Sequence, residues 1–505
     1  MTEHAFATEL DPDQYFQGLA RQEMDFHQAI GELIDNALSA RLSVPHGGGG
    51  KVPAVIEITL EQAADEGTVT VQIADPGQGM TLDEICAHVF NPGGQGKTQG
   101  LLNEHGFGLK NALALLTSGN STNFDLYTRP DDGSVPADTF LHVTGPLSTT
   151  MKVRDDATRK EWGTDLTHLL DAEHGTKLRC TVQMRYLRTV YRRGRAGFDK
   201  LIERLGEHLG VMHRSFIDEG NEIRLAYRTG ANEWTHHSIP AIKIPYQGET
   251  KIISFNVKVG GVDHPVTYER GELGEDHKNK ELAPTLGWPY PLQVYYQFSN
   301  ARCGIDITVR DRVIRSGVFE DIWPEIPKTI AYNRFAGELR VGSDFRTTNN
   351  KTGLDPHGEN WEEVLTLLGE EKEFRPEETT RTASEHTLRK DLLTILKGTF
   401  SGAHVAKDRG TWGGAVEIDI YVDAGPDNIR LYELKAGAGR MLDLYQLLMG
   451  WDGLVADGVK PTVGILVCET VSAQLEKGAE AANARIDSVG NPYKVELKRI
   501  DEVVP

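Results

Sequence analysis

The clearest hydrophobic pattern near the N-terminus lies in residues 30–38. Apolar residues recur there at the spacing of one face of an α-helix: Ile30, Leu33, Ile34, Ala37 and Leu38. Glu32 and Asn36 lie four residues apart on a shared face, so a carboxylate and an amide can contact one small ligand. An amphipathic helix with a solvated polar face explains the same pattern. This stretch alone does not separate the two interpretations.

Residues 54–60 and 68–74 are rich in β-branched side chains and predict a pair of strands. Asp75 ends the second strand and is followed by Gly77 and Gly79. A flat heterocycle can approach such a glycine-rich backbone closely and donate a hydrogen bond to the carboxylate. The Asp-Pro-Gly sequence is also ordinary turn chemistry.

A glycine-rich stretch at residues 91–108 leads into a helix-like segment at residues 109–116. Glycines before a helix start offer bare N–H groups and the positive end of the helix dipole to phosphates. Taken singly, each glycine loop of this chain is weak evidence for a nucleotide site.

From about residue 195 the pattern changes. A helix is predicted at residues 198–212, and a later helix at residues 361–368 closes this region. Strand-like segments lie near residues 222–228, 251–258 and 292–298. Residues 369–384 are charged, contain few apolar side chains and predict a linker.

The C-terminal pattern predicts a helix followed by a β-hairpin. The helix carries four apolar residues on one face: Leu388, Leu392, Ile395 and Leu396. The strands are residues 415–422 and 428–435, and the hairpin puts Asp419 nearly opposite Glu433. Lys435, two positions after Glu433, points the same way. Two carboxylates and a lysine on one face form a site for Mg²⁺ with an adjacent cation, or an ordinary charge arrangement on a solvated hairpin.

Length and composition bound the remaining choices. A chain of 505 residues exceeds what one core usually organises and predicts three or more domains. With 54 Lys and Arg against 74 Asp and Glu, the net charge of −20 requires any DNA contact to use a local basic patch. A candidate patch, equally compatible with a solvated helix face, contains Arg185, Arg188, Arg192, Arg193 and Arg195.

The four cysteines are far apart, which excludes zinc-type spacing and a dense disulfide framework. This usage fits a reducing cytoplasm. The acidic N-terminus has no apolar core of a secretory signal, and no segment approaches membrane-spanning length, so a cytoplasmic protein is expected.

The order of the N-terminal motifs resembles the GHKL ATPase superfamily, which includes gyrase, heat-shock chaperone, histidine kinase and MutL types. Glu-x-x-x-Asn on a helix is followed by Asp-x-Gly-x-Gly after a strand, then by the glycine-rich lid and by His174-Gly-Thr-Lys-Leu. The string Glu-Leu-Ile-Asp-Asn-Ala at residues 32–37 looks most like the MORC branch. A Bergerat-fold ATPase domain is therefore expected at residues 1–195.

The resemblance implies a role for each matching residue. Glu32 is implied as the general base, and Asn36 as a ligand of Mg²⁺ bound with ATP. Asp75 is implied to read the adenine amino group, with Thr176 supporting it through water. The nucleotide would also be contacted by Gly77, Gly79, Gly106, Gly108 and the backbone near Lys110.

Residues 196–368 resemble the transducer domain that often follows in this superfamily and supplies a lysine to the γ-phosphate. An α/β domain is expected there, with Lys351 as the lysine. A lysine in a polar loop is otherwise simply solvated.

Residues 385–505 resemble the PD-(D/E)XK nucleases, whose fold is the α/β restriction-endonuclease type. The match implies Glu385 as the acid of the first helix, Asp419 and Glu433 as ligands of Mg²⁺ or Mn²⁺, and Lys435 as the catalytic lysine. Gln446 on the following helix matches a position that often contacts substrate.

The sequence thus predicts a multidomain α+β protein that combines an ATPase, a transducer and a nuclease. The expected function is DNA cleavage gated by ATP-driven homodimerisation, by analogy in prokaryotic defence against foreign DNA, with a partner protein left open. A DNA-clamping or compacting ATPase that does not cut, and a chaperone-like ATPase that acts on proteins, are the alternatives.

Overall fold

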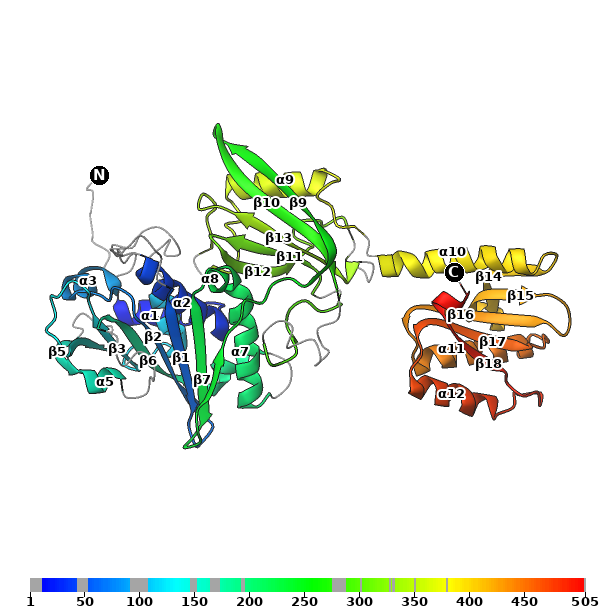
Figure 1. Cartoon of the computed structure of the whole chain (residues 1–505), viewed down its shortest axis with the longest axis horizontal. Helices are drawn as coiled ribbons and strands as arrows, with labels where there is room; N and C mark the ends of the chain where they lie inside the picture. The colour runs from blue at the N-terminus through cyan, green and yellow to red at the C-terminus, as the bar shows by residue number, and fades with distance from the viewer. Residues whose placement is uncertain are drawn as a thin grey trace, which may run out of the picture. The chain divides into compact units, whose positions relative to one another are not determined.

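The computed structural model describes residues 11–42, 53–90, 108–145, 152–163, 173–191, 196–274, 288–299, 302–326, 328, 332–348, 351–377 and 380–503. The chain divides into two compact units (Figure 1). The first comprises Met1–Pro327 and Arg334–Arg375, and the second comprises Lys328–Asn333 and Pro376–Pro505. The first unit contains two sheets and the second contains one sheet.

The first sheet has eight strands in the order β5-β4-β3-β6-β2-β1-β7-β8. Their bounds are β1 Val55–Gln62, β2 Thr68–Asp75, β3 Phe124–Arg129, β4 Thr139–Thr144, β5 Lys152–Thr158, β6 Gly175–Gln183, β7 Glu222–Thr229 and β8 Thr235–Ser238. Neighbouring strands are antiparallel except β1 and β7, which pair in parallel. Because β7 and β8 continue this sheet, it extends beyond the boundary expected at residue 195.

Helices lie against this sheet, and most of them share its hydrophobic core. Their bounds are α1 Pro12–Leu19, α2 Phe26–Leu42, α3 Leu82–Glu84, α4 Gly108–Leu116, α5 Arg159–Gly163, α6 Met184–Leu187, α7 Phe198–Met212 and α8 Arg214–Asp218. The periodic apolar residues of α2 are all buried, so the predicted helix is confirmed. Its polar face is largely buried as well, because Glu32 is only 2% exposed and Asp35 only 1%, whereas Asn36 is partly exposed. The solvated polar face considered for this helix is therefore wrong.

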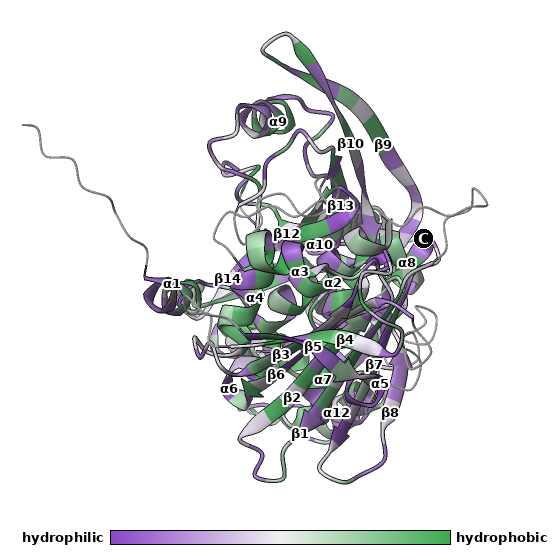
Figure 2. Ribbon diagram, turned by 90° about the vertical axis from the view of Figure 1, so that its left-hand side faces the viewer, coloured by the Kyte–Doolittle hydropathy of each residue, from purple (hydrophilic) through white to green (hydrophobic). Residues whose placement is uncertain are grey.

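The second sheet has the order β12-β11-β13-β10-β9. Its strands are β9 Tyr246–Val259, β10 Val262–Leu273, β11 Gly304–Val309, β12 Arg312–Val318 and β13 Phe335–Val341, and α9 Glu359–Glu370 packs against β9. Strands β9 and β10 form a long hairpin along which polar and apolar residues alternate (Figure 2). At its outer part Ile252 and Val262 are exposed.

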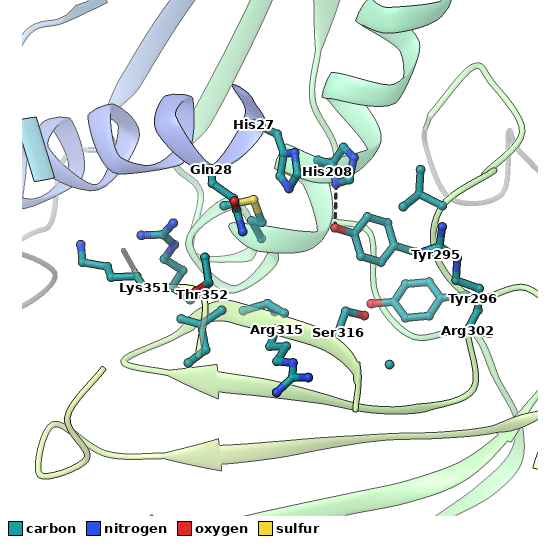
Figure 3. Close-up of a pocket in the computed structure, with 16 residues that line it drawn as sticks. His27, Gln28, His208, Tyr295, Tyr296, Arg302, Arg315, Ser316, Lys351 and Thr352 are labelled. Atoms are coloured by element: carbon teal, nitrogen blue, oxygen red, sulfur yellow. Dashed lines mark hydrogen bonds between the residues drawn. The ribbon is translucent and has the colours of Figure 1, made fainter. Parts of the chain in front are cut away.

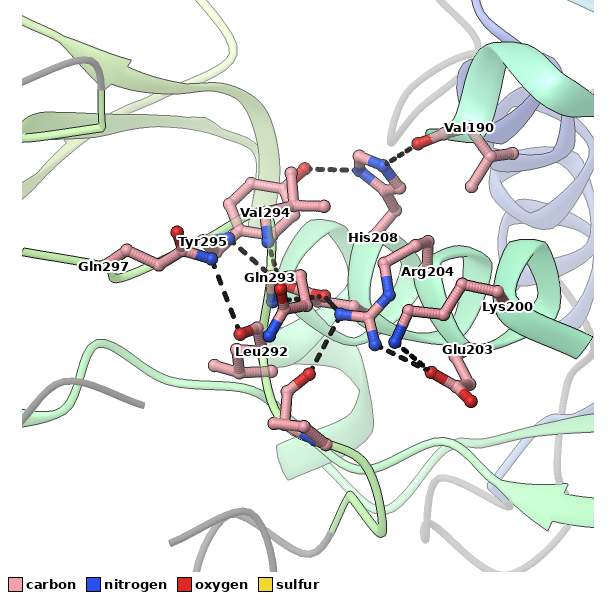
Figure 4. A network of polar contacts seen from close by, with 12 residues as sticks. Val190, Lys200, Glu203, Arg204, His208, Leu292, Gln293, Val294, Tyr295 and Gln297 are labelled. Carbon is pink, nitrogen blue, oxygen red and sulfur yellow. Dashed lines mark hydrogen bonds and ion pairs between the residues drawn. The ribbon is translucent and has the colours of Figure 1, made fainter. Parts of the chain in front are cut away.

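The strand predicted at residues 292–298 is wrong, because this segment is irregular. Glu207 on α7 accepts hydrogen bonds of 2.7–3.0 Å from three successive backbone amides, those of Gln293, Val294 and Tyr295 (Figure 4). Amides that point at one carboxylate cannot also pair with a neighbouring strand. Arg204 completes the site, since it pairs with Glu207 and donates to the carbonyl of Pro291 at 2.9 Å.

The third sheet forms the second unit and has the order β14-β15-β16-β17-β18. Its elements are α10 Thr380–Thr399, β14 His404–Thr411, β15 Val416–Asp423, β16 Ile429–Ala438, α11 Met441–Ala456, β17 Val463–Thr470, α12 Ala473–Asn483, β18 Val495–Arg499 and α13 Ile500–Val503. Strands β14, β15 and β16 are antiparallel, whereas β16, β17 and β18 are parallel. Apolar clusters lie on both faces, one with α10 and one with α11 and α12. Helix α10 begins inside the predicted linker 369–384.

Replacing Glu207 by Ala tests the irregular segment of Figure 4. The change leaves the guanidinium of Arg204 and three amides buried without their acceptor, so we expect a loss of roughly 3–5 kcal/mol in the free energy of unfolding. Urea unfolding measures it. Glu203→Ala, which removes a partner of Arg204 nearer the surface, is the control and should cost at most about 1 kcal/mol. Equal losses for both variants would contradict this account.

Candidate functional site

Helix α2 carries the two polar residues around which the N-terminal site is built. Glu32 and Asn36 lie one helical turn apart, and Asn36 is partly exposed while Glu32 is buried. Asp35 lies one turn after Glu32 on the same side and is also buried. Two carboxylates so close together inside the protein require positive partners.

The second sheet supplies these partners. Arg312, the first residue of β12, donates from Nη1 to Oε1 of Glu32 at 2.8 Å and also pairs with Asp35. Lys351 Nζ lies 3.1 Å from Oε2 of Glu32 and 3.1 Å from Oδ2 of Asp35. On the other side of Asp35, His213 Nε2 lies 3.3 Å from its Oδ1. We call these five residues the ion-pair cluster.

The backbone fixes Lys351 in this position. Lys351 has a φ of +48°, which is uncommon for a residue other than glycine. Its amide donates to the carbonyl of Thr348 at 2.8 Å, and Thr347 bridges to Leu354 across the loop. The structure therefore brings the predicted Lys351 to the predicted Glu32, although 319 positions separate them in the numbering (351 − 32 = 319).

Electrostatics hold Asp35 in its charged form. Burial raises the pKa of Asp35, but the positive charges of Arg312 and Lys351 and the hydrogen bond from His213 outweigh burial, so the pKa is lowered. The same pairing, against the effect of burial, raises the pKa of Arg312. Asp35 and Arg312 are thus both charged at neutral pH.

At the end of β2, Asp75 is buried beside glycine backbone. The amide of Gly77 donates to Oδ1 of Asp75 at 2.8 Å, which orients the carboxylate. A side chain at Gly77 would come within 2.5 Å of this oxygen, and one at Gly79, with its φ of +66°, within 2.0 Å of the carbonyl of Arg129. Thr176 pairs with Asp75 across the sheet and contacts Thr128 Oγ1 at 3.2 Å.

Gly108 opens α4 directly against Glu32. A Cβ at Gly108 would lie 2.6 Å from Oε2 of Glu32, so only glycine keeps this approach open. Lys110, two residues further along α4, is buried, and burial lowers its pKa to about 8. Gly106 lies outside the described residues. The start of α4, Asn36 and Glu32 therefore face one region, whereas Asp75 lies at the end of β2.

Arg185 and Arg188 of the predicted basic patch are exposed at the end of β6. The remaining arginines of the patch, Arg192, Arg193 and Arg195, lie outside the described residues.

In the second unit, Ile420 of β15 pairs with Tyr432 of β16. One position further in the same register, Asp419 lies opposite Glu433. Asp419 accepts from the amide of Leu434 at 2.8 Å, and Lys435 Nζ lies 2.8 Å from Oε1 of Glu433. Glu433 is buried.

The surroundings of these residues differ from the expected metal site in one respect. Arg389 on α10 lies 2.5 Å from Oδ1 of Asp419, a contact that the sequence did not predict. The side chain of Glu385, also on α10, lies outside the described part. Among the described residues, no three His, Cys, Asp or Glu side chains come together as a metal site. Gln446 is exposed on α11.

Sequence reasoning missed the roles of Asp35, His213 and Arg312. Asp35 could have been found, because it follows Glu32 by three positions and so shares its helix face. Arg312 follows a tight turn in which Arg310 and Asp311 both have positive φ. Nothing local to that turn indicates a partner on α2.

The lowered pKa of Asp35 predicts how stability depends on pH. Because the folded-state pKa lies below the unfolded value of about 3.9, the stabilisation is present above about pH 4 and is lost as the pH falls through the folded pKa. We expect Asp35→Asn to lower the free energy of unfolding by roughly 3–5 kcal/mol at pH 7, because it leaves buried cations with one partner fewer. Below pH 4 this difference from the parent should shrink.

Urea unfolding between pH 3 and pH 7 measures both quantities, with the exposed Asp83→Asn as control. A deficit of Asp35→Asn that stayed constant down to pH 3 would show that the charge of Asp35 is not what stabilises the cluster.

Comparisons with known proteins bear on the N-terminal part of the chain. Residues 21–148 match the family described as "Histidine kinase-, DNA gyrase B-, and HSP90-like ATPase". No protein in the curated collection matches the chain. A solved structure described as the N-terminal domain of a DNA repair protein is similar with a TM-score of 0.40 and 14% identity, over 75% of this chain and 98% of that one. A TM-score this low carries no conclusion about fold or function.

In the part that the structure describes, no helix is long and apolar enough to cross a membrane. The matched stretch contains α2, β1, β2 and α4, and so holds Glu32, Asn36, Asp75 and Gly108. Residues 21–148 therefore form an ATPase domain of the histidine kinase, DNA gyrase B and HSP90 type, a kind of domain that binds ATP, typically with Mg²⁺.

Proposed function

We propose that this protein is an ATP-gated, metal-dependent DNA endonuclease in which ATP binding drives homodimerisation. The observation that carries the ATP-gated part is the contact of Lys351 and Arg312, from the second sheet, with Glu32 in the ATPase domain. A nucleotide that changes this contact changes how the two sheets of the first unit are joined.

The residues around Glu32 fit an adenine nucleotide. A Cβ at Gly77 or Gly108 would collide with the carboxylate of Asp75 or of Glu32, so glycine keeps both carboxylates open to a ligand. Asn36 offers an amide oxygen, a hard ligand suited to Mg²⁺. When bound, Mg²⁺ would neutralise phosphate charge. Lys110 would face the phosphates at the start of α4.

In this proposal Glu32 is the general base that orients the attacking water. Both of its oxygens are engaged, Oε1 by Arg312 and Oε2 by Lys351. A γ-phosphate is a stronger partner for Lys351 than a carboxylate already shared with Arg312, because it carries more charge. Lys351 would then move to the phosphate and release Oε2 of Glu32 to accept a hydrogen bond from water.

The same movement would couple ATP to dimerisation. Lys351 belongs to the loop after β13, so its transfer to the nucleotide would reposition this loop against α2 while β12 and Arg312 stay in place. ATP shifts the chain from an open monomer to a closed dimer only to the extent that it binds the closed dimer more tightly than the open monomer. A symmetric dimer carries two nuclease sites, which a double-strand break requires.

The second unit supports the nuclease part of the proposal. Glu433 and Lys435 lie together on the central strand of a sheet that apolar clusters cover on both faces. Charged side chains are rarely buried in such a place unless they are paired or functional. Asp419, Glu433 and Glu385 would hold Mg²⁺ or Mn²⁺, and Lys435 would orient water or steady the phosphate. Arg185 and Arg188 would contact the DNA backbone. By analogy, such a combination would act in prokaryotic defence against foreign DNA.

One observation favours a second candidate, an ATPase that clamps DNA without cutting it. Arg389 neutralises Asp419 at 2.5 Å, and a carboxylate engaged in this way is a poorer metal ligand. In a nuclease, the metal must displace Arg389 from Asp419.

The general-base role of Glu32 predicts the behaviour of Glu32→Ala. We expect hydrolysis to slow by about 10²- to 10⁴-fold, because the attacking water loses its base, while ATP binding persists. Phosphate release measures hydrolysis, and calorimetry measures binding. Glu363→Ala on the exposed face of α9 is the matched control. Hydrolysis at the parental rate would refute the assignment.

The nuclease site predicts a separation of the two activities. Glu433→Ala and Lys435→Ala should both abolish plasmid cleavage in Mg²⁺ and ATP, because one removes a metal ligand and the other a cation at the phosphate, while ATP hydrolysis stays within about 2-fold of the parent. Lys477→Ala on the exposed face of α12 is the control.

Three outcomes of this assay are informative. Parental protein that retains plasmid in a gel shift but never cuts it supports the clamp. Cutting that needs no divalent ion eliminates the proposed site, and cutting that needs no nucleotide eliminates the gating.

A further inference from the structure

A cavity of about 220 Å³ lies beside the ion-pair cluster, between the first turn of α2, α7 and β12 (Figure 3). Its walls include His27 and Gln28 on α2, His208 on α7, and Arg312 and Lys351 of the cluster. Figure 3 shows Lys351 at one end and Arg302 next to Tyr296 at the other. The cavity is smaller than the roughly 300–1,000 Å³ of pockets that take drug-sized ligands, so any occupant is small.

The lining carries one cation that no described carboxylate neutralises. None of the described residues that line the cavity is Asp or Glu. Arg312 and Lys351 pair with Glu32 and Asp35, whereas Arg302 has no ion pair within the described residues. The third arginine of the lining, Arg315, is half-exposed, and its charge is offset by Asp321. In a chain with a net charge of −20, a cavity without any carboxylate is a local exception.

The charge of Arg302 acts on the cavity. Burial, and then the charge of Arg302, lower the pKa of His208 to about 4, against the hydrogen bond to the carbonyl of Val190. His208 is therefore neutral at physiological pH, and it stacks on His27 with ring centroids 3.7 Å apart. Its Nδ1 lies 2.7 Å from the hydroxyl of Tyr295. The imidazoles thus add polar groups to the wall and no negative charge.

A second feature is a buried polar atom beside the cavity. Arg312 is 2% exposed, and its Nε donates no hydrogen bond within the described part of the chain. Buried guanidinium nitrogens are normally satisfied by an acceptor. The positive end of α2, which begins at Phe26, borders the same space.

We propose that this cavity binds a small tetrahedral oxyanion of the phosphate class, held by Arg302 in its wall. The occupant is orthophosphate, which leaves the nucleotide site past Lys351 after hydrolysis. This identification of its source rests on the ATPase activity proposed above, whereas binding of the anion itself does not. The cavity is too small for a whole nucleotide, although the terminal phosphate of one could reach it.

The test is calorimetric titration of orthophosphate into the full chain without nucleotide. The parent should bind, and Arg302→Gln should weaken binding by about 10- to 100-fold, since a hydrogen bond to a charged group is lost. Arg315→Gln, whose arginine pairs outwards with Asp321, is the matched control and should bind within about 2-fold of the parent. Arg302→Lys should restore part of the affinity.

ATP binding should be unchanged in Arg302→Gln, and equal thermal unfolding midpoints would show that the variant is folded. Phosphate that still binds with saturating ADP but not with a non-hydrolysable ATP analogue indicates that the γ-phosphate reaches the cavity; phosphate that binds with both indicates a separate product site. Either result supports an anion site.

Two outcomes would overturn the proposal. These are a parent that binds no orthophosphate, and an Arg302→Gln variant that binds it as the parent does. Neither depends on Glu32, so failure of the ATPase proposal would be seen separately, as parental hydrolysis by Glu32→Ala.

Discussion

The first unit depends on the burial of two carboxylates on one helix. Glu32 and Asp35 are removed from water on α2, and an isolated buried carboxylate is costly enough that it must be paired or protonated. Both cations that pair with them, Arg312 and Lys351, come from the second sheet or its loops. The two sheets are therefore held together at the same residues that form the candidate hydrolytic site. A ligand that alters the charge there necessarily acts on the join between the sheets.

Two further buried networks limit how that join can move. Glu207 on α7 organises the irregular segment before the second sheet. Arg214 on α8 pairs with Asp306 on β11 at 2.7 Å and with Glu338 on β13 at 2.7 Å. Arg214 attaches α8 to the second sheet, and Glu207 attaches α7 to the segment before it. Movement at Lys351 therefore disrupts fewer contacts in its own loop than in the sheet. This distribution of rigid and adjustable contacts suits a lysine that exchanges partners while β12 and Arg312 stay in place.

Features that depend on residues close together in the sequence could be predicted. The periodic apolar residues of α2 and the motif around Asp75 were sufficient to predict an ATPase domain, and the family match at residues 21–148 confirms it. The partner of Glu32 from β12 could not be predicted, since 280 positions separate Glu32 from Arg312 (312 − 32 = 280) and an arginine after a tight turn is ordinary. Residues 292–298 look like a strand because they alternate, yet Glu207 takes their amides. The expected boundary at residue 195 ignored the parallel pairing of β7 with β1, which no local pattern encodes.

The second unit shows the same limit, because its local strand register was predicted and a contact from a distant helix was not. The hairpin of β15 and β16 has the register that its turn implied, and Glu433 and Lys435 meet because residues two apart on a strand share a face. Arg389, by contrast, reaches Asp419 from a helix whose packing angle the sequence does not contain. That contact gives the carboxylate a partner in the protein alone, so a metal ion at Asp419 has to compete with a guanidinium. In the nuclease proposed above, the strength of this competition, rather than the presence of the motif, would decide whether the second unit cuts DNA.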